Sequence, residues 1–398
     1  MTNGDRRSMR LLLVSIAFFW ASLYLYSPTL TPYAEVVGAP VEMIGIIVAS
    51  YGFSQLLLRI PVGIWSDKIG RRRPFLLAAF VTGAISGVVF ALSDNAWGLL
   101  AARTLSGVSA SMWVVISVLF SSYFAPEKAG YAMSLVTSVT TLCQLFWTLA
   151  GGLVAEAWGW HAPFWGAALA GLIGIGITFG TREPQGRPLG LTLRQLVAVG
   201  REPSLLLVSA LASLYQFNLF VTAYGFTPNY AVQLGASKAA LGWLGLVSSL
   251  PAALASFASG GVLARRFREG QLVTAGAALT CVASALIPFC GSMTALYVTQ
   301  ALGGFGRGLV FAVLMGLSIR TVPNELRATA MGFFQSIYAL GMTVGPALGG
   351  VVAAQFGLAG AFYSAAAAMA LATVVALARL SQAFQKPAAP AGGAAASH

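Results

Sequence analysis

One arginine stands in an unusually apolar setting. Arg307 lies within GGFGRGLVFAV, residues 303–313, deep inside a long apolar stretch. A guanidinium at the centre of a bilayer costs roughly 2.5–3.5 kcal/mol on insertion scales, so it cannot face lipid. The glycines around it thin the helix and let a ligand or another helix come close. We expect Arg307 to bind a negative or strongly polar group of a substrate; an arginine held by backbone carbonyls is the alternative.

Two more arginines lie inside apolar runs. Arg59 lies near the end of its run, so we expect its long side chain to reach the lipid head groups. Arg103 lies deeper, at a depth where Glu35 could pair with it and exchange a proton with substrate. No carboxylate or imidazole falls at mid-depth of an apolar run, which leaves Glu35 and Arg103 as the proton-coupling candidates. A static pair or a solvated Glu35 is the alternative.

The composition shows which elements must position these side chains. The chain has 398 residues and is 58% hydrophobic and 9% charged, whereas soluble domains carry about 25% charged residues. Apolar runs of about 20 residues cross a bilayer as helices, so we expect an all-α membrane protein. The twelve predicted spans are 10–34, 42–65, 74–93, 97–120, 129–156, 160–180, 204–233, 238–264, 271–291, 293–319, 327–356 and 358–380.

The basic residues lie almost entirely on one side of these spans. Of the 23 Lys and Arg residues, nineteen fall in the segments on the side of the N-terminus and only Lys238 falls in the opposite loops. The positive-inside rule therefore predicts that both termini are cytoplasmic. We expect the protein to lie in the plasma membrane, which is the inner membrane in bacteria. The basic residues are confined to short loops and form no continuous face, which excludes a nucleic-acid partner.

The chain contains an internal repeat at an offset of about 198 residues. GGLVAEAWGW at 151–160 aligns with GGVVAAQFGL at 349–358, and both copies begin on the same side of the membrane. Parallel repeats suit a carrier whose halves rock about a central site, although a duplication can also simply double a stable bundle. We expect two pseudo-symmetric six-helix bundles, 1–180 and 204–384, a cytoplasmic linker at 181–203 and a disordered tail at 385–398.

A charged motif follows the second span. In RIPVGIWSDKIGRRRP, residues 59–74, the glycines allow a close helix approach and a tight turn, and the acid can accept hydrogen bonds from the arginines. We expect a latch that holds one conformation closed; anchoring to anionic lipid is the alternative. The predicted latch residues are Gly63, Asp67, Gly70, Arg71, Arg72 and Arg73.

This spacing resembles the signature of the major facilitator superfamily, and the resemblance extends over nearly the whole chain. Arg103 with Gly107 is similar to the span-four arginine pattern of its proton-coupled members. GMTVGPALGG at 341–350 looks like the glycine–proline signature of drug–proton antiporters, although it lies on span eleven here and on span five in those proteins. The resemblance implies alternating access and leans towards the drug and metabolite efflux branch.

In that family, spans one, four, seven and ten line the cavity. Aromatic rings with a few amides suit an amphipathic organic molecule, although such side chains more often simply pack. The resemblance thus implies the substrate-binding candidates Tyr26, Arg103, Trp113, Tyr215, Asn218, Gln300, Arg307 and Phe311.

We therefore expect a monomeric secondary transporter that exports drug-like or metabolite compounds, coupled to the proton gradient. The alternatives are an organic-anion uniporter or exchanger that uses Arg307, and a non-transporting receptor or scaffold. The expected partners are a small-molecule substrate, the lipid bilayer and protons. The sequence contains no catalytic, phosphate-binding or metal-ligand spacing, and its three cysteines imply no disulfide, so we expect no enzyme activity and no cofactor or metal.

Overall fold

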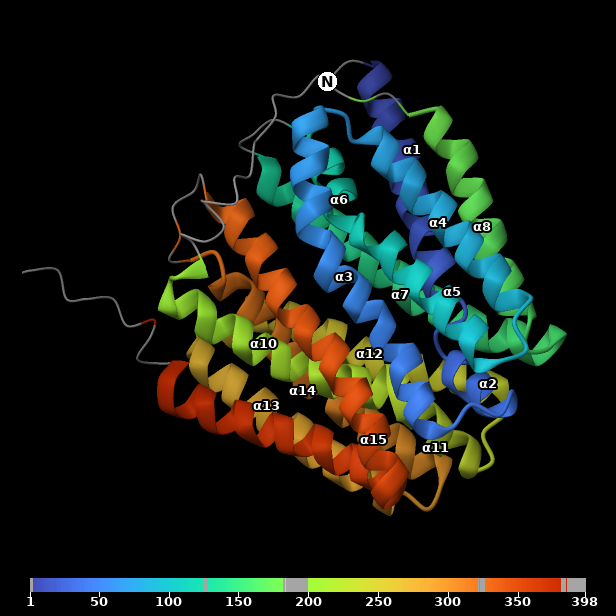
Figure 1. The fold of residues 1–398 in the computed structure, drawn as a ribbon. Coiled ribbons are helices and arrows are strands. Elements are labelled where there is room, and N and C mark those ends of the chain that lie inside the picture. Colours follow the sequence, from blue (N-terminus) through green and yellow to red (C-terminus); the bar gives the residue numbers. More distant parts are fainter. Residues whose placement is uncertain are drawn as a thin grey trace, which may run out of the picture.

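The computed structural model describes residues 3–124, 128–181, 183, 200–320, 322, 326–380 and 384, which form helices and no strand. Figure 1 shows the chain as two groups of helices that meet along one side. The first group contains α1 (Asn3–Tyr24), α2 (Leu30–Val36), α3 (Val41–Ile69), α4 (Arg73–Ala91), α5 (Ala96–Ser111), α6 (Trp113–Ser121), α7 (Ala129–Trp158) and α8 (Ala162–Phe179).

The second group contains α10 (Pro203–Val221), α11 (Thr227–Gln233), α12 (Lys238–Gly260), α13 (Glu269–Leu286), α14 (Met293–Leu317) and α15 (Arg327–Val375). A π-helical turn, Thr222–Phe226, joins α10 to α11, and short turns at Leu263–Arg265, Ile287–Phe289 and Ala376–Leu380 extend other helices. We call the groups the first half and the second half. Most of the linker predicted at 181–203, namely residues 182 and 184–199, and the tail at 385–398 lie outside the described residues.

Each predicted span coincides with a helix or with a pair of successive helices. Ten described stretches are long and apolar enough to cross a membrane, and the last of them, Thr329–Leu380, contains two predicted spans. Gly357 divides that stretch, because its φ of 70° and ψ of 178° are not helical. The first span consists of α1 and α2, and the seventh consists of α10, the π turn and α11. The break therefore occurs at the same place in both halves, as the repeat predicts.

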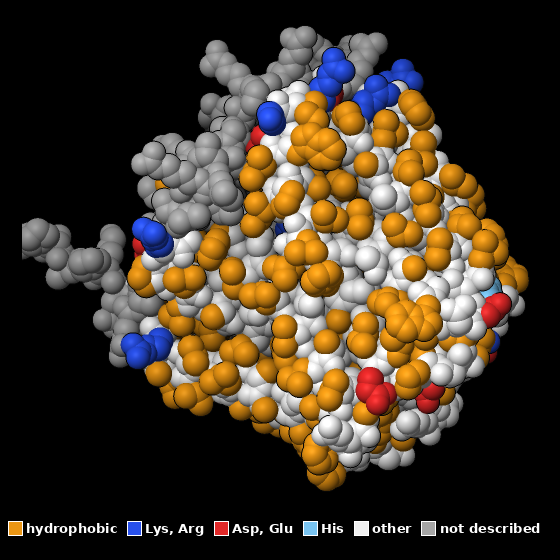
Figure 2. All heavy atoms as spheres, viewed as in Figure 1, with side chains coloured by type: hydrophobic (Ala, Val, Ile, Leu, Met, Phe, Trp, Pro, Cys, Tyr) orange, Lys and Arg blue, Asp and Glu red, His pale blue; other side chains and the backbone are white. Residues whose placement is uncertain are grey.

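Charge distinguishes the two ends of the molecule. One end, which we call the basic end, carries Arg71 in the α3–α4 turn and Arg266 after α12. The opposite end, the acidic end, carries Glu35, Asp94 and Glu156. In Figure 2, Lys and Arg lie along the upper and left edge, Asp and Glu gather at the lower right, and hydrophobic side chains cover the belt between them. This belt has the composition of a surface that faces lipid.

Small residues bring the two halves together towards the acidic end. A Cβ atom on Gly45 of α3 would lie 2.3 Å from the backbone oxygen of Pro346 on α15. On the other side of the contact, a Cβ atom on Gly152 of α7 would lie 2.5 Å from the backbone nitrogen of Gly242 on α12. These helices therefore touch backbone to backbone, a contact that any larger side chain would prevent.

Candidate substrate-binding site

Arg103 lies buried in the first half with aromatic rings instead of a counter-ion. It is on α5 and is 5% exposed. Its guanidinium carbon lies 4.2 Å from the ring centroid of Tyr51 and 5.8 Å from that of Tyr26. Its Nη1 donates to the Tyr26 hydroxyl at 3.4 Å. A cation–π contact of this kind partly replaces the solvation that a buried guanidinium loses.

Arg307 occupies a comparable position in the second half. It is on α14, is 3% exposed, and donates through Nη2 to the Ser248 hydroxyl on α12. A Cβ atom on Gly304 would lie 2.0 Å from the backbone oxygen of Ser248, so the glycine brings α12 within reach of the guanidinium. This burial agrees with the prediction that Arg307 does not face lipid. The glycines around it allow α12 to approach closely, also as predicted. Binding of a substrate group by Arg307 stays a prediction.

Tyrosines lie between the two arginines and connect the halves. The Tyr224 hydroxyl on the π turn donates to the Tyr24 hydroxyl of α1 at 3.4 Å. In addition, the ring of Tyr51 stacks on Phe220 of α10 with centroids 6.1 Å apart. Tyr24, Tyr51 and Tyr224 are not among the binding candidates predicted from the sequence. Their positions on the predicted spans one, two and seven could have suggested them.

The second half adds a cluster of aromatic rings beside Arg307. Tyr215 and Phe311 stack with ring centroids 5.0 Å apart, and Phe311 contacts Tyr338 of α15 edge to face at 5.8 Å. Phe311 lies one helical turn after Arg307 on α14, so the ring that Tyr215 stacks on is close to the arginine. The predicted residues Tyr215, Arg307 and Phe311 are therefore brought together. We call the band formed by both arginines and these aromatic side chains the seam; its members are Tyr24, Tyr26, Tyr51, Arg103, Tyr215, Phe220, Tyr224, Arg307, Phe311 and Tyr338.

Asn218 makes contacts inside the second half in this conformation. Its side chain is fully buried and donates to the Ser284 hydroxyl at 2.8 Å and to the Ala365 carbonyl at 3.1 Å. Both partners belong to the second half, on α13 and on α15 beyond Gly357, so the amide holds α10 to its own bundle. Asn218 Oδ1, like Gln300 Oε1, has no hydrogen-bond partner among the described residues, so a binding role for Asn218 stays a prediction.

The two remaining predicted binding residues, Trp113 and Gln300, have no side-chain hydrogen bond or ring contact with a member of the seam among the described residues. Trp113 stacks on Phe19 at 6.0 Å and contacts Trp20 at 5.0 Å, all within the first half. Gln300 of α14 is 2% exposed, and its Oε1 has no hydrogen-bond partner among the described residues. An unpartnered buried amide oxygen costs stability unless something bonds to it, so Gln300 keeps its place as a binding candidate.

Glu35 and Arg103 do not pair. Glu35 is exposed on α2 at the acidic end, where its Oε2 accepts from Asn229 Nδ2 of α11 at 2.6 Å. The same amide donates to the Thr31 carbonyl at 3.1 Å, and the Thr31 hydroxyl donates to the Gly225 carbonyl at 2.8 Å. The predicted pair is therefore wrong: Glu35 joins the acidic-end parts of spans one and seven, while Arg103 lies over tyrosine rings.

Arg59 does not reach the lipid head groups, contrary to prediction. It is 5% exposed and turns into the contact between α3 and α15. Its Nη2 donates to Gln55 Oε1, and its Nη1 donates to the Tyr338 hydroxyl at 3.0 Å and lies 3.5 Å from the Gln335 carbonyl. The polar groups of the facing helix solvate the guanidinium here, and reaching the interface would have removed these bonds.

The charged motif forms a compact turn at the basic end. Gly70 takes a φ of 68° and ends α3, which confirms the predicted tight turn. Asp67 and Arg72 form an ion pair at 3.5 Å. Arg73 donates to the Phe179 carbonyl at the end of α8 at 2.8 Å. The motif thus ties spans two, three and six of the first half together.

Gly63 makes no close helix contact in this conformation, and Arg71 faces the surface. No described atom lies within 4 Å of a Cβ placed on Gly63, and Arg71 is exposed. The close helix approach expected at Gly63 occurs instead at Gly45 of the same helix. The role of the motif as a latch stays a prediction.

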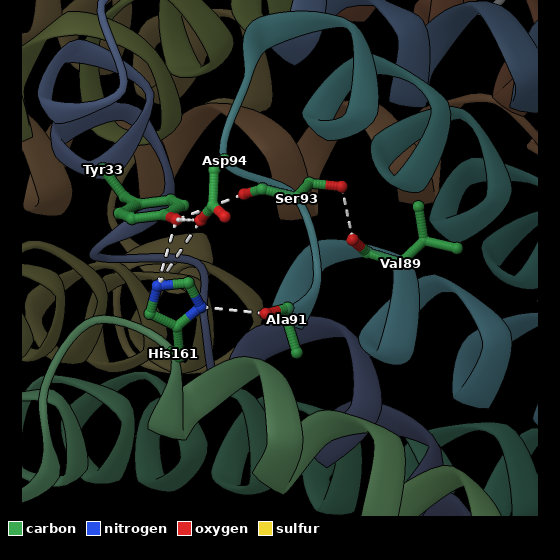
Figure 3. Close-up of polar contacts among 6 residues, drawn as sticks. All are labelled: Tyr33, Val89, Ala91, Ser93, Asp94 and His161. Atoms are coloured by element: carbon green, nitrogen blue, oxygen red, sulfur yellow. Dashed lines mark hydrogen bonds and ion pairs between the residues drawn. The ribbon is translucent and has the colours of Figure 1, made fainter.

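A polar cluster fixes α2 at the acidic end (Figure 3). The Tyr33 hydroxyl lies 3.1 Å from the Ser93 carbonyl, 3.2 Å from Asp94 Oδ1 and 3.2 Å from His161 Nε2. His161 Nδ1 contacts the Ala91 carbonyl at 2.9 Å. These groups all belong to the first half, so the cluster holds the end of span one against spans three, four and six. The described residues contain no group of His, Cys, Asp or Glu arranged to hold a metal ion.

Comparison with known proteins accounts for this architecture. The model of the Major Facilitator Superfamily matches residues 12–235 and 206–397. The inner membrane transport protein YajR of Escherichia coli is 25% identical over 374 residues, which cover 92% of this chain and 82% of that protein. The multi-drug resistance efflux pump PmrA of Streptococcus pneumoniae is 25% identical over 358 residues, which cover 86% of this chain and 88% of the pump.

A solved structure shares the fold at lower identity. It is a bacterial homologue of the human lysosomal transporter Spinster in an inward-facing and unoccupied conformation, with a TM-score of 0.80 and 16% identity. The likeness covers 98% of this chain and all of the other. Because the family model matches nearly the whole chain, this protein is an integral membrane transporter, not an enzyme, and belongs to the Major Facilitator Superfamily.

Proposed function

We propose that the protein exports amphipathic organic compounds, drug-like or metabolic, by alternating access, and that the seam binds them. The observation that carries the proposal is a band of buried and half-buried aromatic rings shared by the two halves, with one buried arginine in each half. Rings give apolar contact area with little loss of entropy, and few polar groups set the orientation. The likeness to an efflux pump supports export.

The conformation supports a cycle that starts from the cytoplasm. The halves are joined at the acidic end by Glu35 with Asn229 and by Glu156, whose Oε2 accepts from the Ala239 backbone nitrogen at 3.1 Å. The positive-inside rule assigns the acidic end to the outside. A seam closed on that side would receive its compound from the cytoplasm or the inner leaflet, as export requires.

The proton gradient is the driving force in this proposal, but Glu35 does not carry the proton. A coupling group must be reached from one side at a time. Glu35 is exposed to solvent at the acidic end even though that end is closed. Its access to solvent therefore does not alternate between the two sides of the membrane. Proton exchange through a Glu35–Arg103 pair is therefore not part of the mechanism.

Organic-anion transport is the second candidate function. Among the described residues, Arg103 and Arg307 contact tyrosine and serine side chains and pair with no carboxylate. A buried guanidinium that lacks a counter-ion favours a ligand that brings one. In this reading, Arg307 holds the anionic group and the aromatic rings hold the rest of the molecule.

Purified protein in liposomes tests both candidates. Three aromatic compounds of matched size, one anionic, one neutral and one cationic, are followed while pH and voltage gradients are imposed separately. For Arg307→Gln, anion transport predicts a rise of about tenfold or more in the half-saturating concentration of the anion, because a charge-assisted bond is lost. The neutral compound should change less than twofold.

Two further variants make the result decisive. Arg307→Lys keeps the charge and should retain most anion transport, and Arg268→Gln removes an exposed arginine from the basic end as a control. Equal loss for all three compounds would mean that Arg307 only supports the bundle. Transport that follows the voltage and ignores the pH gradient would exclude proton coupling.

A further inference from the structure

A cavity of about 770 Å³ opens at the basic end of the first half, away from the seam. It lies where the start of α1, the start of α4 and the end of α8 converge, the region at the top of Figure 1. Polar and charged side chains dominate its wall, which includes Arg7, Ser8, Arg73, Phe179, Thr181 and Glu183. The proposed transport path does not use it.

The charge of this cavity is positive. Arg7 is exposed and comes from α1, while Arg73 comes from α4 and is half-buried. Glu183 supplies the opposing charge, but its carboxylate accepts from the backbone nitrogens of Arg72 and Arg73, at 2.5 Å and 3.3 Å. Glu183 therefore compensates the N-terminus of α4. Arg73 donates through Nε and Nη2 to the Thr178 and Phe179 carbonyls, which fixes its guanidinium in the wall, and the two arginines with Glu183 leave one net positive charge to attract an anion.

An apolar stripe leads along α8 to the cavity. Trp165, Leu169, Leu172 and Phe179 lie at helical spacing on one face, and their exposed fractions are 48%, 58%, 58% and 65%. The guanidinium of Arg73 lies 5.9 Å from the ring centroid of Phe179, so the stripe ends directly at the charged wall. A molecule with an anionic head and long apolar tails would match both surfaces at once.

We propose that this cavity binds the head group of an anionic glycerophospholipid, with its acyl chains along the α8 stripe. The phosphate would lie between Arg7 and Arg73, which come from different helices and so define one position along the rim of the protein. A zwitterionic head group carries its own cation beside the phosphate and would bind less well there. The site depends on the membrane location of the chain and is independent of what the seam transports.

Native mass spectrometry of the detergent-purified protein measures the binding. Phosphatidylglycerol and phosphatidylcholine of the same chain length are titrated separately, and inorganic phosphate is titrated as a competitor. We expect phosphatidylglycerol to bind more tightly, and Arg7→Gln to weaken it about fivefold, the effect of one basic residue at a membrane surface. Arg7→Glu should weaken it about 25-fold. Arg266→Gln, an exposed arginine at the same end of the second half, is the matched control and should change nothing.

The outcomes separate clearly. Selective loss in the two Arg7 variants, with size-exclusion profiles like that of the wild type, supports the site. Equal binding of both lipids, or equal weakening by Arg7→Gln and Arg266→Gln, overturns it. Displacement of the lipid by inorganic phosphate at similar concentration overturns the assignment to a lipid and points to a soluble phosphate compound.

Discussion

The guanidinium of Arg59 in the first half lies 3.0 Å from the hydroxyl of Tyr338 in the second. The same tyrosine ring lies under the guanidinium carbon, 5.6 Å away, and also contacts Phe311 of the seam. Arg59 thus joins α3 to α15, the helices that also touch at Gly45, and it connects this contact to the proposed binding site. Movement of one half against the other must break this bond.

Tyr338→Phe should favour opening of the basic end, because Arg59 and Tyr338 lie nearer the basic ends of α3 and α15 than the contact of Gly45 with Pro346 does. The change keeps the ring and removes the hydroxyl that Arg59 bonds, and a hydrogen bond to a charged group contributes about 1.5–3 kcal/mol. We expect the open population to rise about tenfold or more.

Spin labels at Ile69 and Val262, exposed at the end of α3 and just after α12, report the separation at the basic end. Labels at Val36 and Val232, exposed on α2 and α11, report the acidic end, all in a background without the native cysteines.

Ser336→Ala is the control for this experiment, since the Ser336 hydroxyl bonds Gly332 within α15 at 2.9 Å. Identical distance distributions in the two variants would show that the bond between Arg59 and Tyr338 does not bias the conformation.

Gly45→Ala should prevent closure of the acidic end. The added Cβ would lie 2.3 Å from the Pro346 oxygen and 3.0 Å from the Gly350 Cα, both backbone atoms that cannot turn aside. Overpacking of this kind costs about 1–3 kcal/mol, so we expect transport to fall about tenfold and the Val36–Val232 label distance to lengthen. Gly316→Ala is the matched control, because no described atom lies within 4 Å of its Cβ. Normal closure in Gly45→Ala would contradict the tight contact.

Asn218→Ala should lower stability and leave substrate preference unchanged. The variant leaves the Ser284 hydroxyl and the Ala365 carbonyl without their amide partner inside the second half. Such a loss costs about 1–3 kcal/mol, which a thermal unfolding assay in detergent detects as a lower midpoint. The ratio of transport rates for the three charged and neutral aromatic compounds should match the wild type. A changed ratio would return Asn218 to the binding site.

Glu35→Gln should leave the response to a pH gradient intact. The amide oxygen of the new side chain still accepts from Asn229, and the lost charge is at an exposed position. We expect transport within about twofold of the wild type, because exposed ionic contacts contribute about 1 kcal/mol at most. Liposome transport measured with and without a pH gradient checks this. A loss of gradient dependence, with binding retained, would restore Glu35 as the proton carrier.

Sequence reasoning identified the elements because lipid leaves few choices. A chain in hydrocarbon must satisfy its backbone internally, so each apolar run becomes a helix and each polar interruption becomes an end. Glycine marks two of these helix ends. Gly70 and Gly357 both take a positive φ, a backbone conformation that other residues rarely adopt, so the helix ends there. Arg307 was also recognisable, because a charge at that depth has to be buried in protein.

The sequence alone thus determined the membrane class, the span boundaries, the repeat and the family motif. Only the tertiary structure decided how each helix is rotated, and therefore that Arg59 faces the opposite half, that Asn218 faces its own bundle and that Glu35 lies apart from Arg103. The physical reason is that the lipid-facing and protein-facing sides of these helices are both apolar. In soluble proteins, hydrophobic periodicity shows which face of a helix is buried. In this chain it gives almost no such information, and packing between small residues sets the rotation of each helix about its axis instead.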